Sequence, residues 1–311
     1  MSEEHKTRAG AKASPPLCRS VAANTQERVA FLDAYPHWLV ERIWHDYGPQ
    51  EATRFFTTQD AKGLFLRIHR ENDGESFLKQ LDIDGIAFSQ PYPEIKECIL
   101  LHETPQLQSA TLAPFYEIGA FYIQNPASQR VCGLANQFVR KNVLDLCAAP
   151  GGKISGLQIS NAKAFAVEAN SNRIPLMQEN FTRLRKTVEV LQQSVLDSAT
   201  LVSNADTIIL DPPCSGLGVL AKHPEKRWTL SPEDADRLAR TQTEMLHFCL
   251  QHMQKNAVLL YSVCTIDKTE TERVVRSALD CNDNTRIIEQ QTFLPDAFGH
   301  DAHYVAILQK S

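Results

Sequence analysis

The sequence has no cysteine pair in CxxC spacing, no long apolar run and no excess of positive charge. It holds eight cysteines; without CxxC spacing a zinc knuckle is excluded, and reduced thiols are expected rather than a disulfide framework. No apolar run approaches the length that spans a bilayer. The N-terminal stretch MSEEHKTRAGAKASPP has no apolar core, so we expect residues 1–28 to be a flexible tail and not a secretory signal.

The charge balance argues against a protein covered with positive potential. The net charge is -5, and residues 31–120 hold seven Lys and Arg against fourteen Asp and Glu. Any contact with a nucleic acid must therefore come from local basic clusters. At 311 residues the chain can form one large or two modest domains.

The stretch Asn142 to Lys153, NVLDLCAAPGGK, has the pattern of a buried strand that runs into a glycine-rich turn. Small residues let a ligand approach the backbone closely, and a helix that follows offers free N–H groups. We expect such a helix from Lys153. The pattern predicts a cofactor-binding turn.

The part before this turn predicts a small N-terminal subdomain over residues 29–120. Residues 29–56 have helical apolar spacing with a break at Gly48-Pro49. Strands are expected at 63–70, 86–88 and 98–101 and a helix at 75–81, which indicates a small α/β or ferredoxin-like unit for RNA recognition. Arg67, His69 and Arg70 could meet RNA phosphates, although arginines on such a strand are more often simply solvated.

Residues 121–311 predict the catalytic domain. A strand at 121–123 and a helix at 127–139 precede the turn. After it, strands are expected at 163–169, 188–193, 206–211, 257–263 and 303–309, and helices at 171–186, 231–252 and 269–280. This alternation predicts an α/β fold with a doubly wound, mostly parallel sheet, whose ligands bind at the carboxyl ends of the strands.

Three nucleotide-type ligands can be compared at the turn. A P-loop is excluded because Cys147 replaces its first glycine and Ile154 follows Lys153, and the GxGxxG pattern of dinucleotide folds is absent. S-adenosylmethionine (SAM) remains. Asp145 or Asp211 would suit its cationic groups, and Glu168, which ends the next strand, would accept its ribose hydroxyls. A plain surface charge is the alternative for Glu168.

Two cysteines follow two further strands. Asp211-Pro212-Pro213 ends one strand before Cys214, and Cys264 ends another. A lone cysteine at a strand end usually serves only to pack the core, but two cysteines at neighbouring strand ends suggest a catalytic role. A thiolate that adds to carbon 6 of a pyrimidine makes carbon 5 nucleophilic, and Asp211 could bind the N3/N4 edge of cytosine and supply a proton.

Together these residues resemble the RNA (cytosine-5)-methyltransferase family, the NOL1/NOP2/Sun group. Four motifs in the family's order carry the resemblance: DLCAAPGGK, DPPCSGLGVL, HPEKRW and YSVCTI. YPHWLVERI, LFLRIHR and YIQNPASQ most resemble the bacterial 16S ribosomal RNA enzymes within it. The resemblance implies a Rossmann-like class I SAM-dependent methyltransferase domain.

The resemblance also implies roles for individual residues. Cys264 would be the nucleophile, and Cys214 would assist product release. Apart from the resemblance, Lys153 has a second possible role, which is to orient the target base beside Asp211. The expected cofactor-binding residues are Cys147, Ala148, Ala149, Pro150, Gly151, Gly152, Lys153, Glu168, Ser194 and Asp211.

Several positions depart from the family pattern. Glu168 stands where Asp is usual, and Val263 replaces the usual Thr before the nucleophile. Ser194 stands where an Asp usually lies near the adenine, with Asp197 three residues on, and either could take that role. The 16S enzymes also carry a helical domain that resembles NusB, where only a short lead-in stands here. These departures suggest a divergent member.

We expect SAM-dependent methylation of carbon 5 of a cytosine in RNA, the favoured target being 16S (small-subunit) ribosomal RNA. A transfer RNA cytosine-5 methyltransferase and a non-catalytic RNA-binding ribosome-assembly factor are the alternatives. The expected partner is RNA, single-stranded or with its cytosine flipped out, without membrane or metal, for a cytoplasmic monomer. Candidate RNA contacts, which could also be solvated surface, are Lys222, His223, Lys226 and Arg227, and Arg173, Arg183, Arg185 and Lys186.

Overall fold

The computed structural model describes residues 34–59, 63–103 and 105–311. The described residues up to Phe56 form one compact unit, and those from Thr57 form another. The first unit consists mainly of helix α2, His37–Thr57, which is interrupted at Gly48 (φ 75°, ψ 171°) ahead of Pro49. The predicted helical pattern and its break are therefore confirmed for these residues. The expected tail, residues 1–28, lies outside the described residues.

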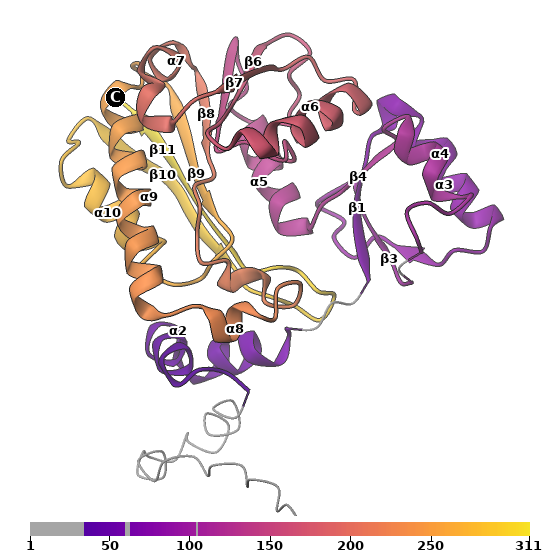
Figure 1. The fold of residues 1–311 in the computed structure, drawn as a ribbon, viewed down its shortest axis with the longest axis horizontal. Helices are drawn as coiled ribbons and strands as arrows, with labels where there is room; N and C mark the ends of the chain where they lie inside the picture. The colour runs from indigo at the N-terminus through magenta and orange to yellow at the C-terminus, as the bar shows by residue number, and fades with distance from the viewer. Residues whose placement is uncertain (1–33, 60–62, 104) are drawn as a thin grey trace, which may run out of the picture. The chain divides into compact units, whose positions relative to one another are not determined.

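The second unit begins with a small antiparallel sheet in the strand order β2-β3-β1-β4 (Figure 1). Its strands are β1 (Leu64–Ile68), β2 (Phe88–Ser89), β3 (Cys98–Leu101) and β4 (Phe121–Ile123), and its helices are η2 (Arg70–Asn72), α3 (Gly74–Ile83) and α4 (Leu112–Glu117). The sequence division at residue 120 leaves β4 in the catalytic part, whereas its residues pair with β1 from Leu66↔Ile123 to Ile68↔Phe121.

The two faces of β1 have different partners. Leu66 and Ile68 pack into a core with Phe77 and Leu81 of α3. Because side chains alternate along a strand, Phe65 and Arg67 point to the opposite face. This alternation directs Arg67 away from the small core and toward the glycine-rich turn of the second sheet.

The second sheet has seven strands in the order β10-β11-β9-β8-β5-β6-β7. The strands from β9 to β7 pair in parallel, while β11 runs antiparallel between β9 and β10. Their bounds are β5 Asn142–Leu146, β6 Lys163–Glu168, β7 Glu189–Gln192, β8 Thr207–Leu210, β9 Val258–Val263, β10 Thr285–Phe293 and β11 His303–Lys310. The order in which the chain adds strands reverses between β5 and β8, and sheets of this kind bind ligands at the carboxyl ends of the strands at such a point.

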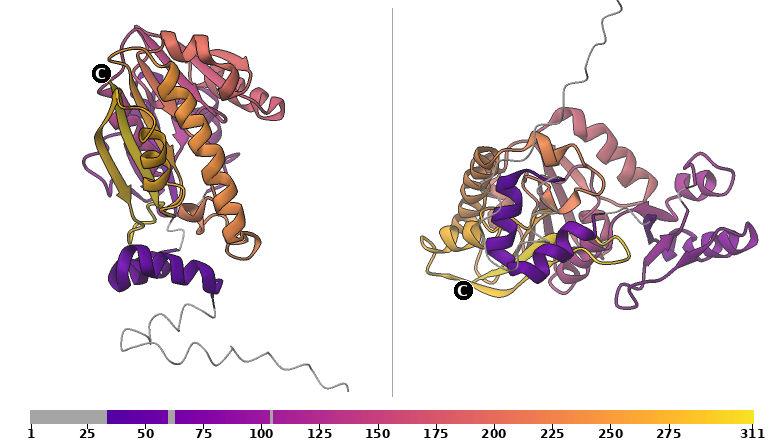
Figure 2. Two further views of the ribbon diagram at one scale, coloured as in Figure 1. Left: turned by 90° about the vertical axis from the view of Figure 1, so that its left-hand side faces the viewer. Right: turned by 90° about the horizontal axis from the view of Figure 1, so that it is seen from below.

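Helices cover both faces of this sheet (Figure 2). Leu144, Ile208 and Leu259 pack with α7, α9 and α10, whereas Val143 and Ile209 pack with α5 and α6. The helices are α5 (Pro126–Asn136), η3 (Ile154–Gly156), η4 (Ser171–Arg173), α6 (Ile174–Arg183), η5 (Val195–Asp197), α7 (Ala199–Asn204), η6 (Leu217–Val219), α8 (Lys226–Thr229), α9 (Pro232–His252) and α10 (Glu272–Leu279). The predicted doubly wound, mostly parallel sheet is confirmed.

Within the described ranges, no helix is long and apolar enough to cross a membrane.

One local expectation was wrong, and one strand was not predicted. The helix expected from Lys153 is a single 3-10 turn, η3, after which Leu157 is extended. The Gly152 carbonyl accepts hydrogen bonds from the Arg67 and Gln124 side chains and not from the N–H that would continue a helix. Strand β10 was not predicted, because its residues are mostly exposed and polar and it is defined by pairing with β11.

The start of α9 gives a test of the fold. Ser231 and Asp234 form a reciprocal capping box, in which each side chain bonds the other residue's backbone N–H. We expect Ser231→Ala to lower the free energy of unfolding by about 1 kcal/mol, because one N-terminal donor loses its acceptor. Urea denaturation would measure this loss, with the exposed Ser203→Ala on α7 as control. Equal effects of the two changes would contradict the role of the cap.

Candidate active site

The carboxyl ends of β5, β6, β8 and β9 bring together the main residues expected in the site. The glycine-rich turn follows β5, Glu168 ends β6, Asp211 follows β8 and Cys264 follows β9. The loop after β8 also carries Cys214, whose sulfur lies 3.3 Å from that of Cys264. Positions far apart in sequence thus meet at one edge of the sheet.

The turn after β5 depends on backbone shapes that small residues permit. Cys147 has φ 61° and Gly151 has φ 90°, both in the left-handed region. A Cβ on Gly151 would lie 2.7 Å from the ring of Phe181, so that ring packs directly on the turn. The Pro150 carbonyl accepts a bond from Asn180 Nδ2 at 3.0 Å. Helix α6 therefore supports one side of the turn.

Arg67 supports the other side. Its guanidinium is buried and donates to the Gly152 carbonyl at 2.9 Å, to Ser155 Oγ at 2.8 Å and to Gln124 Oε1. Burial lowers the pKa of Arg67. The hypothesis that Arg67 and His69 meet RNA phosphates is wrong, because both side chains are buried. The strand alternation contained the signal: Arg67 shares its face with Phe65.

Asp145 lies beneath the turn and is buried. Its Oδ2 accepts the Ile154 N–H at 3.2 Å, while its Oδ1 is buried without a hydrogen-bond partner among the described residues. Burial raises the pKa of Asp145 to about 7. An unpaired buried oxygen is costly, so this carboxyl is a candidate for a contact with a bound molecule.

Glu168 is buried and tied to the same turn. It accepts the Ala149 N–H at 3.3 Å and the Asn170 N–H at 2.9 Å, and Arg173 lies 3.4 Å from it. These bonds exclude a plain surface charge for Glu168. Ser194, expected at the adenine position, follows β7 and accepts the Leu196 N–H at 3.2 Å, while Asp197 is exposed.

Lys153 and Asp211 form an ion pair across the site at 2.5 Å. Burial acts to lower the pKa of Lys153, but the Asp211 carboxylate and its hydrogen bond raise it further, so the net shift is upward. The lysine is thus held as a cation beside the cysteines. It also helps to lower the pKa of Cys264.

The pKa values of the two thiols are shifted in opposite directions. The hydrogen bond from Cys214 lowers the pKa of Cys264, and it outweighs the opposing effects of burial and Asp211. The same hydrogen bond, with burial, raises the pKa of Cys214 well above its usual value. Burial and nearby carboxylates raise the pKa of Cys147 to about 12. Cys264 is therefore the thiol of these three that most readily becomes a thiolate.

A buried carboxylate joins the loops that carry the two thiols. Glu270 Oε2 accepts the Ser215 N–H at 2.8 Å and Gln242 Nε2 at 2.9 Å, and burial raises the pKa of Glu270. Ser215 Oγ and Thr265 Oγ1 lie 2.9 Å apart. The sequence interpretation missed Glu270, which falls within the helix expected at 269–280.

Several basic residues proposed for RNA contact have partners within the described chain. Lys222 pairs with Asp301 at 2.5 Å, His223 lies 3.3 Å from Glu225, and Lys226 donates to the Ser215 carbonyl at 2.9 Å. Lys186 pairs with Glu71 at 3.2 Å. Arg183 donates to the Tyr116 and Phe121 carbonyls and covers the Tyr116 ring, which argues for a structural role. Arg185 is exposed, and no cluster of three or more His, Cys, Asp or Glu suited to a metal occurs in the described ranges.

The strand order and the placement of the site at the carboxyl edge define a class I SAM-dependent methyltransferase fold. The methyltransferase homolog protein from Pyrococcus horikoshii has this fold, with a TM-score of 0.77 at 22% identity over 92% of this chain and 99% of that one.

Residues 134–309, more than half of the chain, match the model of the 16S rRNA methyltransferase RsmB/F family, and the chain belongs to this family. It is 29% identical to the ribosomal RNA small subunit methyltransferase B of Serratia proteamaculans, over 86% of this chain and 62% of that protein. It is 27% identical to the probable methyltransferase B of Bacillus subtilis, over 91% and 68%. The chain thus spans about two thirds of the length of these relatives.

Removal of the buried guanidinium should destabilise the protein. We expect Arg67→Met to lower the free energy of unfolding by about 3 kcal/mol, because several buried acceptors lose their donor. Arg67→Lys should recover part of this loss. The exposed Arg70→Met, three residues away, is the control and should change stability by less than about 0.5 kcal/mol. Urea denaturation of all three variants tests this, and an Arg67→Met protein as stable as Arg70→Met would refute it.

The thiol contact predicts a pH effect with a definite sign. Cys214 donates to Cys264 and lowers its pKa, so Cys214→Ala should raise that pKa and move its alkylation to higher pH. Cys214→Ser, which keeps a donor, should shift the profile less. Mass spectrometry of the Cys264 peptide after brief iodoacetamide treatment at each pH would measure this. The exposed Cys281 serves as internal control, and an unchanged Cys264 profile would contradict the contact.

Proposed function

We propose that this chain methylates carbon 5 of a cytosine in small-subunit ribosomal RNA, with SAM as methyl donor and Cys264 as nucleophile. The observation that carries the proposal is the contact of the two thiols, 3.3 Å apart, with Cys264 the more acidic. A hydrogen bond between two thiols requires that the fold hold both sulfur atoms in place, which packing at two strand ends does not require. Family membership and the names of the bacterial relatives support the ribosomal target.

The fit of SAM to the turn is supported by its charge and size. Asp145 accepts the Ile154 N–H, Glu168 accepts the Ala149 N–H and Asp211 pairs with Lys153, so three carboxyl groups border the turn. Such a setting suits a cationic sulfonium and amino group. The residues that would hold SAM are the turn Cys147–Lys153, Glu168 for the ribose, and Asp211, with Ser194 or Asp197 toward the adenine. SAM, when bound, supplies the methyl group.

The protein residues prepare the cytosine for that transfer. The Cys264 thiolate forms a bond to carbon 6, and the ring electrons move so that carbon 5 becomes nucleophilic. Asp211 accepts from the N4 amino group, and the Lys153 cation beside it stabilises the negative charge that develops near N3. The base must leave any helix to expose its ring face, which favours a single-stranded or flipped cytosine.

Product release needs a base for the carbon 5 proton, and Cys214 is placed to assist. Its pKa is high mainly because it donates to the Cys264 sulfur. Once that sulfur is bonded to carbon, this cause is removed and Cys214 can lose its proton more easily. The Cys214 thiolate can then take the carbon 5 proton, as the carbon–sulfur bond breaks and Cys264 leaves as thiolate.

The proposal predicts a trapped intermediate. Cys214→Ala protein incubated with SAM and unmethylated small-subunit ribosomal RNA should accumulate a covalent RNA–protein adduct, visible as a band that resists denaturing gel conditions. Cys264→Ala should give neither adduct nor methylation, and Cys281→Ala should behave as the wild type. Bisulfite sequencing would locate the methylated cytosine. Failure of the wild type to methylate ribosomal or transfer RNA, with no adduct in Cys214→Ala, would favour a non-catalytic RNA-binding factor.

Methylation of transfer RNA alone would keep the chemistry and change the target. The test therefore includes unmethylated transfer RNA as a parallel substrate. The thiol pair and the Lys153–Asp211 pair serve both targets equally, so no residue of the catalytic edge separates them. The difference must come from surfaces outside that edge.

A further inference from the structure

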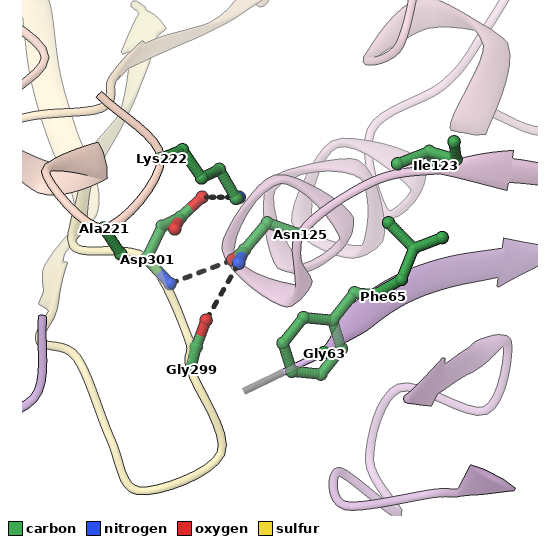
Figure 3. Close-up of a pocket in the computed structure, with 9 residues that line it drawn as sticks. Gly63, Phe65, Ile123, Asn125, Ala221, Lys222, Gly299 and Asp301 are labelled. Carbon is green, nitrogen blue, oxygen red and sulfur yellow. Dashed lines mark hydrogen bonds and ion pairs between the residues drawn. The ribbon is translucent and has the colours of Figure 1, made fainter. Parts of the chain in front are cut away.

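A small cavity lies between the small sheet and two loops of the catalytic sheet, and the proposed reaction does not use it (Figure 3). Phe65 of β1 and Ile123 of β4 form its apolar side. Lys222, from the loop after Cys214, and Asp301, from the loop before β11, form its polar side. The cavity therefore joins residues from both sheets of the second unit.

Hydrogen bonds fix the wall of this cavity. Asn125, the N-cap residue of α5, donates from Nδ2 to the Gly299 carbonyl at 3.1 Å. Its Oδ1 accepts the Asp301 N–H at 3.0 Å and the Ala127 N–H at 3.0 Å. One amide thus ties the loop before β11 to the end of β4, so the cavity is formed before any ligand arrives.

The same wall connects to the nucleophile by two backbone bonds. The Gly218 N–H donates to the Cys264 carbonyl at 2.9 Å, and the Ala302 N–H donates to the Gly218 carbonyl at 2.9 Å. A Cβ on Gly218 would lie 2.0 Å from the Ala302 oxygen, so the segments pack without side chains between them. Two backbone hydrogen bonds through Gly218 thus connect Ala302, the residue after Asp301, to Cys264, and they place this wall of the cavity near the thiol site.

The lining matches the two parts of a nucleotide. Ile123 is 42% exposed and, beside the buried Phe65, it offers an apolar surface to a base. The Lys222 side chain is 47% exposed, and its ammonium has three donors, of which the contact with Asp301 uses one. The others can reach a phosphate, while the Asp301 carboxylate can accept hydrogen bonds from the amino group of a base.

We propose that this cavity binds a nucleotide that neighbours the target cytosine in the RNA strand. A purely apolar ligand would have no use for the lysine, and a free anion would have none for the apolar wall. The inference rests on the proposed function for the identity of the ligand. It adds a subsite that holds the strand while the cytosine reaches Cys264.

Binding of a short single-stranded RNA tests the subsite. The probe is a fluorescein-labelled oligonucleotide with one central cytosine flanked by uridines, and fluorescence anisotropy gives its Kd. We expect about tenfold weaker binding for Ile123→Asp and for Lys222→Gln. The matched controls are Ile288→Asp, an equally exposed isoleucine on β10, and Lys163→Gln at the amino end of β6; both should bind as the wild type.

The readouts separate this inference from the proposed reaction. SAM affinity by calorimetry should be unchanged in every variant, which shows that each protein is folded. If Ile123→Asp and Lys222→Gln bind RNA like their controls while the wild type methylates RNA, the subsite is refuted and the reaction stands. A third outcome is that the wild type binds the oligonucleotide and the two variants do not, while the wild type methylates neither ribosomal nor transfer RNA. The subsite then stands and the reaction is refuted. No binding by the wild type refutes the subsite.

Discussion

Contact between two sulfur atoms, 3.3 Å apart, is the constraint on which the catalytic edge depends. Cys214 and Cys264 belong to loops that leave neighbouring parallel strands, whose spacing is about 4.8 Å. Flexible loops would hold the thiols at variable distances. Here Glu270 binds one loop through the Ser215 N–H, and Ser215 binds the other through Thr265. The buried carboxylate thus converts two loops into one rigid support.

On the cofactor side of the site, a buried charge likewise holds a loop in place. A guanidinium in the interior costs several kcal/mol unless its donors are satisfied, and Arg67 satisfies them with acceptors that belong to the glycine-rich turn. Because Arg67 comes from β1, the small sheet cannot shift without disturbing the turn. The surface that we propose for RNA and the turn that we propose for SAM are therefore mechanically joined.

Much of this arrangement could be predicted from the sequence, and for a physical reason. Apolar strands that end in glycine, proline or a lone polar residue mark their own carboxyl ends, so the turn after β5, Asp211 and Cys264 were assigned to one edge correctly. The alternation along β1 indicates which face Arg67 occupies but not its partners, and the burial of Glu270 could not be assigned from the sequence at all. Each looks like a solvated charge until the partner elements, distant in sequence, are placed beside it.

Strand β10 and helix η3 show the same limit in the backbone. The exposed, polar residues of β10 have no apolar alternation, and their extended form comes from pairing with β11. The turn at η3 is short because side chains of Arg67 and Gln124 take the Gly152 carbonyl that a helix would need. In both places a tertiary contact overrides the local preference.

The difference in pKa between the two thiols suits them to different roles in the proposed reaction. One hydrogen bond lowers the pKa of Cys264 and raises that of Cys214, so Cys264 is the thiol of the pair that loses its proton first. In the proposed reaction this polarity reverses when Cys264 bonds to carbon, since Cys214 then loses the acceptor that kept it protonated. A single cysteine could attack the ring, but it would have no neighbour whose acidity rises at the moment a base is required. Cys147, whose pKa lies near 12, could not take either part.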